Sequence, residues 1–345
     1  MQALKAVFLV SLYVIGIKAG AQGISGKPDG YLRSLEAKNK AMGSVCVRKK
    51  GSVLYQKAFG YSSLNPKIKP DTLTRYRVGS VSKTFTAVII LQLAEEKKLK
   101  LSDSLSRFFP GWPNAGRISI EHLLRHQSGI HNFAKDGSEK YRHADPQNRE
   151  DILAIFSQAE TDFKPGSRTE YNNANYVVLS LIAENLDSLD FSSIVDKRII
   201  EPLNLENAYV GGAINIEKGE AFSYYYKRGW KKNTQVYANT LMGAGAMVSS
   251  PSDLCRFMEA LFGLKFFSQH YLDQMLSLQG NMGLGIFRYP FGSALCYGHS
   301  GSINAFQSIS VYFPEEDLSF ALCLNGLNMD MNEILIEVLR AFIKP

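Results

Sequence analysis

The chain has 345 residues, of which 45% are hydrophobic and 21% are charged. This composition is typical of a compact folded protein and excludes a disordered or fibrous chain. The formal net charge is +7, but the basic residues are scattered and lack the periodic aromatic interleaving of a nucleic-acid reader. We therefore expect no nucleic-acid partner.

The first 21 residues predict a secretory signal peptide. Lys5 precedes a mostly apolar stretch over residues 6–17, and small residues end the segment at Ala21. The stretch is too short to span a bilayer, so we expect cleavage after Ala21, a periplasmic or secreted protein, and no stable membrane insertion afterwards. The alternative is an ordinary buried helix at the start of the chain.

Strand patterns occur near both ends of the remaining chain, residues 22–345, which is longer than one core usually fills. Residues 43–47 and 52–58 flank a turn that contains glycine, and residues 307–313 and 318–324 flank a second turn. Helical patterns cover residues 85–96, 120–125, 149–158, 175–185, 191–200 and 331–343, and a further helix begins at Ser250.

The order of these elements predicts a mixed α+β fold. One antiparallel sheet is expected to assemble from both chain ends, flanked by helices, over about residues 22–80 and 245–345. A mainly helical lobe, at about 81–244, is then inserted between the two halves of the sheet lobe.

Two basic clusters, at residues 48–50 and 227–232, are typical of solvated turns. Contact with an anionic cell-envelope surface is the alternative for both. The four cysteines lie far apart without metal-ligand spacing, so buried free thiols are expected, with a disulfide between two predicted strands as the alternative. They are Cys46, Cys255, Cys296 and Cys323, and the two in predicted strands are Cys46 and Cys323.

Three histidines raise the question of a metal site. His122 and His126 are four residues apart, and His131 follows. The pattern lacks the HExxH arrangement, and the apolar residues beside it indicate a structural helix end. We therefore expect no metal.

Ser80 and Lys83 form the sharpest chemical signal in the chain. Residues 84–94 are apolar around most of the helical circumference, which predicts a buried helix with Ser80 at its start. Side chains three residues apart share a face, and burial together with the positive helix end disfavours the ammonium form of Lys83. A neutral amine there is able to take the proton of Ser80. The alternative is an N-cap serine followed by a surface lysine.

Two further segments carry polar groups suited to chemistry. Tyr171 and Asn173 alternate in a predicted extended loop, so they would face a nucleophile together, move a proton and hold a substrate carbonyl. Ordinary turn and N-cap residues are the alternative. Residues 297–302 place His299 between two glycines, where backbone amides can meet an oxyanion or a peptide. A glycine-rich turn with an exposed histidine is the alternative.

In this order the three segments resemble the penicillin-recognising serine hydrolases. The nearest branch contains class C β-lactamases, D-alanyl-D-alanine carboxypeptidases and related esterases. The family elements S-x-x-K, Y-x-N and [KH]-[ST]-G appear here at residues 80–83, 171–173 and 299–301, and the resemblance runs from about Gly43 to Leu324. It implies a β-lactamase/transpeptidase-like fold, an acyl-enzyme mechanism, and no metal or organic cofactor.

The resemblance also implies catalytic roles. Ser80 would be the acylated nucleophile and Lys83 its activating partner. Tyr171 would transfer a proton to the leaving group and activate the deacylating water, while Asn173 would orient Lys83 and the substrate amide. Whether Lys83 or Tyr171 is the general base stays open.

Binding roles follow in the same way. His299, Ser300 and Gly301 would receive the carboxylate side of the substrate, and the backbone amides of Ser80 and Ser302 would form the oxyanion hole. Class C β-lactamases usually carry Lys-Thr-Gly at the third element, and a histidine that is neutral near pH 7 is a weaker carboxylate anchor. Strong β-lactamase activity is therefore not the first expectation.

The function expected from these residues is a serine hydrolase acting through an acyl-enzyme on a D-amino-acid peptide, a β-lactam or an ester. Its partners would be a small-molecule or peptide substrate, with peptidoglycan as a candidate. A carboxylesterase on the same scaffold is one alternative. A non-catalytic or slowly acylating protein that binds peptidoglycan or β-lactams is another.

Overall fold

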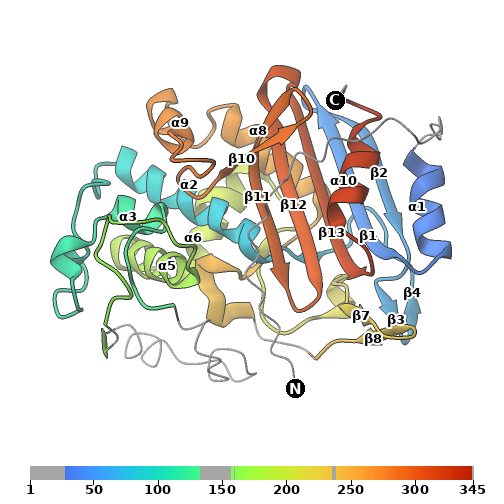
Figure 1. The fold of residues 1–345 in the computed structure, drawn as a ribbon, viewed down its shortest axis with the longest axis horizontal. Helices are drawn as coiled ribbons and strands as arrows, with labels where there is room; N and C mark the ends of the chain where they lie inside the picture. Colours follow the sequence, from blue (N-terminus) through green and yellow to red (C-terminus); the bar gives the residue numbers. More distant parts are fainter. Residues whose placement is uncertain (1–27, 133–156, 159, 235–237, 344–345) are drawn as a thin grey trace.

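The computed structural model describes residues 28–132, 157–158, 160–234 and 238–343 (Figure 1). The predicted signal peptide and nearly all of the predicted helix at 149–158 lie outside these residues. Within them, no helix combines the length and apolar character needed to cross a bilayer.

The main sheet is antiparallel along the order β10-β11-β12-β13-β1-β2. Its strands are β1 (Ala41–Lys49), β2 (Ser52–Phe59), β10 (Phe287–Phe291), β11 (Ala294–Ile303), β12 (Phe306–Phe313) and β13 (Leu318–Leu327). The two chain ends meet where β1 pairs with β13, from Ala41 opposite Leu327 to Lys49 opposite Leu318. The predicted sheet from both chain ends is therefore confirmed.

The remaining strands are short. They are β3 (Ser63–Leu64), β4 (Lys67–Ile68), β5 (Tyr76–Arg77), β6 (Tyr209–Val210), β7 (Tyr224–Tyr226), β8 (Trp230–Lys232) and β9 (Met247–Ser249). β7 pairs with β8 and also joins the main sheet, where Tyr224 lies opposite Gly326 of β13. Residues 81–244 thus contribute to the sheet as well as to helices, and the division into two lobes at these boundaries stays a prediction.

The helices lie on both faces of the main sheet (Figure 1). They are α1 (Pro28–Ala37), α2 (Ser82–Glu95), α3 (Ile120–Leu124), α5 (Asn173–Asp187), α6 (Phe191–Val195), α7 (Glu201–Leu203), α8 (Pro251–Phe262), α9 (Gln269–Leu276) and α10 (Met331–Leu339). α1 and α10 pack through Leu32 and Ile334 against one face, and α8 packs through Phe257 against the other.

Several helix ends differ from their predicted positions because of local hydrogen bonds. α5 begins at Asn173, two residues earlier than predicted, because the Asn172 side chain accepts a hydrogen bond from the Ala174 amide at 2.9 Å. The predicted helix at 191–200 is confirmed at its start but continues as a π-helical turn over Asp196–Ile200. The helix predicted to begin at Ser250 is confirmed, with the Ser250 hydroxyl accepting from the Asp253 amide at 3.2 Å.

All four cysteines are buried thiols without a disulfide. Cys46 and Cys323 lie on neighbouring strands, but the register places Cys46 opposite Ala321 and Cys323 opposite Ser44. The Cys255 thiol instead donates to the Cys46 carbonyl across 3.5 Å. Each cysteine therefore behaves as a small apolar side chain of the core.

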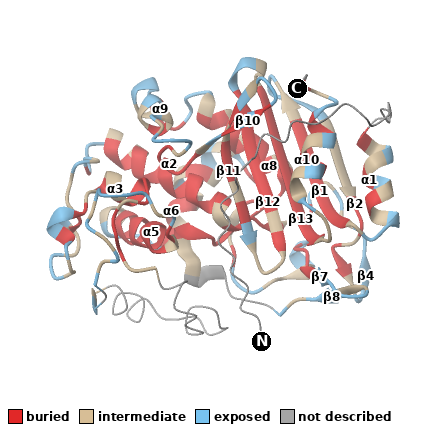
Figure 2. Cartoon of the chain, in the orientation of Figure 1, coloured by how far each residue is buried: buried red, intermediate tan, exposed pale blue. Residues whose placement is uncertain are grey.

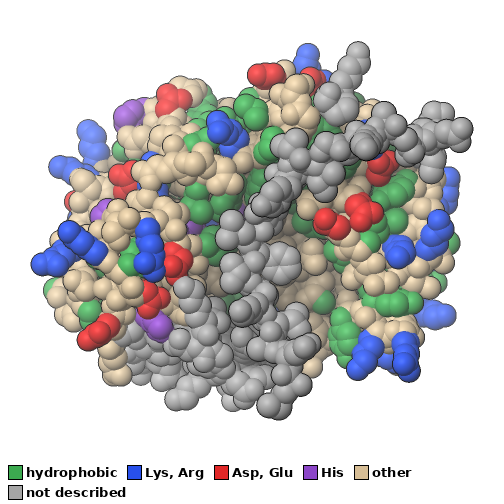
Figure 3. All heavy atoms as spheres, in the orientation of Figure 1, with side chains coloured by type: hydrophobic (Ala, Val, Ile, Leu, Met, Phe, Trp, Pro, Cys, Tyr) green, Lys and Arg blue, Asp and Glu red, His purple; other side chains and the backbone are tan. Residues whose placement is uncertain are grey.

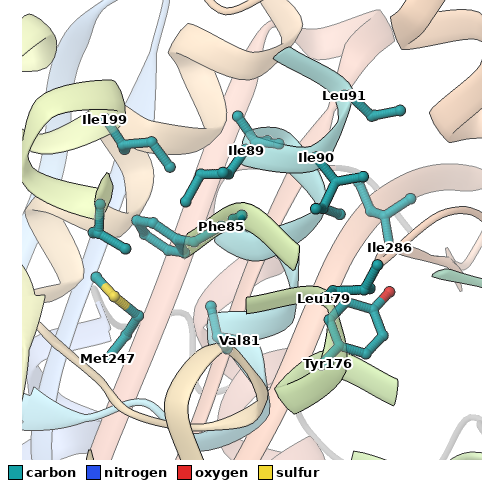
Figure 4. Close-up of a cluster of buried hydrophobic side chains, with 14 of the residues drawn as sticks. Val81, Phe85, Ile89, Ile90, Leu91, Tyr176, Leu179, Ile199, Met247 and Ile286 are labelled. Carbon is teal, nitrogen blue, oxygen red and sulfur yellow. The ribbon is translucent and has the colours of Figure 1, made fainter. Parts of the chain in front are cut away.

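Helix α2 is the centre of the larger core. Twelve of its fourteen residues are buried (Figure 2), so it carries almost no solvent face. The charged side chains in view lie on the outer surface (Figure 3). Inside, Phe85 of α2 stacks on Phe257 of α8 with ring centroids 3.8 Å apart, and Figure 4 shows Phe85 among apolar side chains that include Val81 and Met247. This packing fixes the start of α2 against the sheet.

Replacing Phe257 by alanine tests this packing. We expect Phe257→Ala to lower the free energy of unfolding by about 3–5 kcal/mol, because it leaves a cavity beside Phe85. Leu73→Ala is the control, since that side chain is 57% exposed, and should change stability by less than about 0.5 kcal/mol. Urea unfolding measures both, and equal effects would show that α2 does not depend on this contact.

Candidate active site

Ser80 lies in a 3₁₀ turn, Gly79–Val81, that leads directly into α2. Lys83 follows in the first turn of the helix, and its Nζ is 3.1 Å from Ser80 Oγ. No side chain caps α2, so the alternative interpretation of Ser80 as an N-cap is wrong. The two residues meet across three positions because the turn and the helix present them on one face.

The Lys83 amine is fully buried and makes three polar contacts. Besides Ser80 Oγ, it donates to Asn173 Oδ1 at 2.8 Å and to the Ala244 carbonyl at 2.7 Å. Among the residues that the structure describes, no carboxylate forms an ion pair with it, and burial holds the pKa of Lys83 well below its ordinary value. A neutral amine has two donors and one lone pair. The two carbonyl oxygens can only accept, so the lone pair is left for the Ser80 hydroxyl.

Tyr171 is a second residue that contacts the Ser80 hydroxyl. Its phenol is hydrogen-bonded to the Ser80 side chain, and the Lys83 Nζ lies 4.9 Å from its ring centroid. Although 38% of the side chain is exposed, the phenol group itself is desolvated. Desolvation raises the pKa of Tyr171, and the hydrogen bond to Ser80 only partly opposes this. Tyr171 is therefore a protonated phenol beside the Ser80 hydroxyl.

Residues 299–302 belong to strand β11 and not to a turn. β10 pairs with β11 only up to Gly298, so among the described residues no strand covers the outer edge of β11 beyond that point. The turn before α2 lies against this edge. A Cβ on Gly301 would lie 1.9 Å from the Val78 carbonyl oxygen and 2.9 Å from the Ser80 amide nitrogen, so only glycine fits there.

The same close approach places two backbone amides together. Gly79 has φ +51°, and a Cβ there would lie 2.9 Å from the Ser302 amide nitrogen. The backbone around the Ser80 amide and that around the Ser302 amide are therefore in close contact, and the oxyanion hole that these two amides would form stays a prediction. The Ser300 side chain is hydrogen-bonded to Tyr289, which lies on the neighbouring strand β10.

His299 is buried, with only 3% of its surface exposed. Its Nδ1 lies 2.5 Å from the Ser300 carbonyl oxygen, and its Nε2 is buried without a hydrogen-bond partner. Burial lowers the pKa of His299 to about 3. The imidazole is therefore neutral near pH 7, and the third element presents no fixed cation. The exposed histidine of the alternative interpretation is wrong.

Comparison with known proteins identifies the family of this chain. The sequence profile of the family described as Beta-lactamase matches residues 32–341. The chain belongs to this family.

Among curated relatives, the putative penicillin-binding protein PbpX of Bacillus subtilis is 28% identical over 273 residues, covering 78% of this chain and 67% of that protein. Penicillin-binding protein 4* of the same species is 28% identical, covering 68% and 55%. The teichoic acid D-alanine hydrolase of Staphylococcus aureus is 27% identical, covering 68% and 57%. The chain thus spans between about half and two thirds of the length of these relatives.

Solved structures show the same fold. The D-amino acid amidase from Ochrobactrum anthropi SV3 has a TM-score of 0.80 at 23% identity, covering 91% of this chain and 98% of that one. The octameric penicillin-binding protein homologue from Pyrococcus abyssi has a TM-score of 0.79 at 26% identity, covering 91% and 76%. The predicted resemblance and the β-lactamase/transpeptidase-like fold are confirmed.

The sequence analysis did not identify His126 as part of the site of this beta-lactamase family member. Its ring centroid lies 4.5 Å from that of Tyr171, and its Nδ1 accepts from the Asn172 amide at 3.1 Å. Its carbonyl accepts from the Glu170 amide at 2.9 Å. Burial holds the pKa of His126 well below its ordinary value, so the ring is neutral, and its Nδ1 meets both the amide and the carbonyl oxygen of Asn172 at 3.1 Å. His126 therefore fixes the segment that carries Tyr171 from both sides.

The three histidines considered for a metal face different partners. His122 Nδ1 accepts from the Ser119 amide at 3.2 Å, and His131 Nδ1 lies 2.5 Å from Asp162 Oδ1. Across residues 28–132, 157–158, 160–234 and 238–343 no group of three or more His, Cys, Asp or Glu is arranged to hold a metal ion.

The positioning role of His126 is testable in a double-mutant cycle. We expect His126→Ala to lower kcat at least tenfold with little change in KM, because Tyr171 loses its support. The same change should cost little more in a Tyr171→Phe background. His126→Asn should recover part of the loss, since asparagine tolerates the positive φ of 57° and offers an acceptor oxygen. Additive losses would show that His126 acts independently of Tyr171.

The buried state of His299 predicts a pH dependence of stability. An unfolded histidine takes up a proton below about pH 6.5, whereas His299 in the folded protein does so only near pH 3. Stability is therefore lost as the pH falls from about 6.5 towards 3. The free energy of unfolding of the native protein should fall about 1.4 kcal/mol per pH unit more steeply than that of His299→Gln between pH 5.5 and 4. Parallel urea-derived curves would exclude a buried neutral histidine.

Proposed function

We propose that the protein is a serine hydrolase that forms an acyl-enzyme from D-aminoacyl amides or esters. The observation that carries the proposal is the 3.1 Å contact between Ser80 Oγ and the buried Lys83 amine, with which no carboxylate of the described residues forms an ion pair. A hydroxyl beside a desolvated amine is an activated nucleophile. Neighbouring backbone amides supply the stabilisation that the oxyanion needs.

In the proposed acylation step, Lys83 Nζ takes the Ser80 proton as Oγ bonds to the substrate carbonyl carbon. The amides of Ser80 and Ser302 hold the oxyanion. When the bond to the leaving group breaks, Tyr171 gives its phenolic proton to the leaving nitrogen or oxygen and is reprotonated from Lys83. Since the raised pKa of Tyr171 and the lowered pKa of Lys83 both favour this assignment, Lys83 is the general base of acylation.

In deacylation, a water molecule replaces the leaving group. Tyr171 takes a proton from this water and passes its own phenolic proton to the Lys83 amine as the water oxygen bonds to the acyl carbon. When the bond to Ser80 Oγ breaks, Lys83 returns the proton to Oγ and the starting state is restored. Asn173 holds the Lys83 amine through its 2.8 Å contact throughout. No step of this mechanism uses a metal or an organic cofactor.

The substrate class rests on His299 and on the relatives. A neutral His299 offers no fixed positive charge that could bind the free C-terminal carboxylate of a substrate. A substrate with an uncharged amide or ester group beyond the scissile bond is therefore favoured over one that ends in D-alanyl-D-alanine. The names teichoic acid D-alanine hydrolase and D-amino acid amidase both denote hydrolases of D-amino-acid derivatives. Peptidoglycan is a further candidate substrate.

A periplasmic or secreted location, after removal of residues 1–21, is part of the same proposal.

The second candidate is a slowly acylating penicillin-binding protein, which the names of two relatives favour. It would use the same Ser80 nucleophile but keep the acyl group. Intact-mass measurement after incubation with a penicillin separates the two functions, because a lasting adduct indicates a binder and rapid release indicates a hydrolase.

Steady-state assays of Ser80→Ala test the proposed function. We expect the native protein to hydrolyse D-alanine p-nitroanilide or a D-alanyl ester faster than the L-enantiomer. Ser80→Ala should lose this turnover and any covalent adduct while its thermal unfolding changes little, since a hydroxyl facing the cleft contributes little to stability. Turnover at the native rate by the variant would remove Ser80 from the mechanism. Turnover of neither enantiomer by the native protein would refute the substrate class.

A further inference from the structure

The β7–β8 hairpin, residues 224–232, is an unusual surface element. It contains three tyrosines, a tryptophan and four basic residues, and no acidic residue. One bridge pairs it with the main sheet, where Tyr224 lies opposite Gly326, and the half-buried Trp230 ring packs against the same glycine. The basic residues are Lys227, Arg228, Lys231 and Lys232. At the tip of the hairpin, Lys227 and Arg228 are exposed to solvent.

The aromatic and basic side chains of the hairpin are available on its surface. Tyr225 is 46% and Tyr226 is 38% exposed. The register places Tyr225 opposite Lys231, and Tyr226 packs edge-on against Trp230 with centroids 5.2 Å apart. Among the described residues, none of the four basic side chains forms an ion pair; Lys232 instead lies over the Phe222 ring. Four uncompensated cations thus lie among exposed aromatic rings.

The neighbouring β3–β4 hairpin extends this surface. The Leu64 amide of β3 donates to the Tyr224 hydroxyl at 2.8 Å, which holds the two hairpins together. β4 exposes Lys67 and Ile68. Figure 1 draws both hairpins at the same corner of the molecule, and Figure 3 shows basic and hydrophobic side chains gathered there.

The basic cluster at residues 48–50 provides an internal contrast. There Arg48 pairs with Glu259 at 3.0 Å and Lys49 pairs with Glu316 at 2.7 Å. Its turn carries no aromatic side chain. The two clusters look alike as charge runs, but only the 224–232 hairpin combines free cations with exposed aromatic rings.

We propose that the β7–β8 hairpin binds the surface of an anionic lipid bilayer. Lys and Arg side chains near such a surface each gain about 1 kcal/mol from its negative potential. Tyr and Trp rings gain by resting at the headgroup level, where one end of the ring is apolar and the other is wet. A soluble polyanion without apolar groups, such as polyphosphate, would use the charges alone and leave the exposed rings without a role. The binding is peripheral and leaves the fold intact.

Vesicle co-sedimentation of the full chain tests the proposal. Vesicles of phosphatidylglycerol mixed with phosphatidylcholine should bind the protein more tightly than phosphatidylcholine alone, and added salt should weaken the difference. Comparing the two vesicle types separates the charge-dependent binding from any contribution of residues 1–21, which all variants share.

Paired substitutions locate the binding surface. Lys227→Gln with Arg228→Gln should lower the partition onto anionic vesicles roughly 30-fold, the equivalent of about 2 kcal/mol for two basic residues. Tyr225→Ser with Tyr226→Ser should lower it at least fivefold. The matched control, Lys49→Gln with Lys50→Gln, removes the same charge and should change it less than threefold. Thermal unfolding confirms that each variant is folded.

Tryptophan fluorescence gives a second readout. The chain has two tryptophans, Trp112 and Trp230, so Trp112→Phe leaves Trp230 as the reporter in the hairpin. Its emission should shift to shorter wavelength on anionic vesicles. Equal binding by the hairpin and control variants would overturn the proposal. So would an unshifted Trp230 together with hairpin-dependent binding of soluble polyphosphate, which would assign the surface to anionic polymers.

Discussion

The desolvation of one amine is the constraint on which the rest of the site depends. Lys83 is able to act as a base only if water and carboxylates are kept from it. The structure achieves this by placing α2 inside the core, so that twelve of its fourteen residues are buried. The partners of the amine come from the 3₁₀ turn, from α5 and from the segment ending at Ala244. Folding of two distant segments onto the start of α2 therefore sets the chemistry of one side chain.

A second constraint acts on the backbone around the nucleophile. Gly79 and Gly301 let the turn before α2 lie directly against β11, and a side chain at either position would collide with the facing backbone. This contact brings the backbone at Ser80 close to the backbone at Ser302, and among the described residues no strand pairs with the outer edge of β11 beyond Gly298. Main-chain contact thus fixes the positions of the proposed nucleophile, the proposed oxyanion donors and the proposed substrate-binding strand relative to one another.

Sequence reasoning succeeded where the signal was local. The i, i+3 spacing of Ser80 and Lys83, the apolar circumference of the helix that follows and the cap at Ser250 depend on residues within one or two turns. The sheet from both chain ends followed from two hairpin patterns. His126 was missed because its role arises from contacts with Asn172 and Tyr171, more than forty positions away. The attachment of β7 to β13 was missed for the same reason, since one bridge leaves no periodic pattern.

The most direct test of this account is the titration of Lys83 itself. Nuclear magnetic resonance of protein labelled at lysine Cε, with Lys83→Gln to assign the signal, follows the ionisation of this one amine. The account predicts that Lys83 loses its proton well below the pH at which the surface lysines titrate. A Lys83 signal that titrates together with them, near pH 10.4, would contradict the central claim.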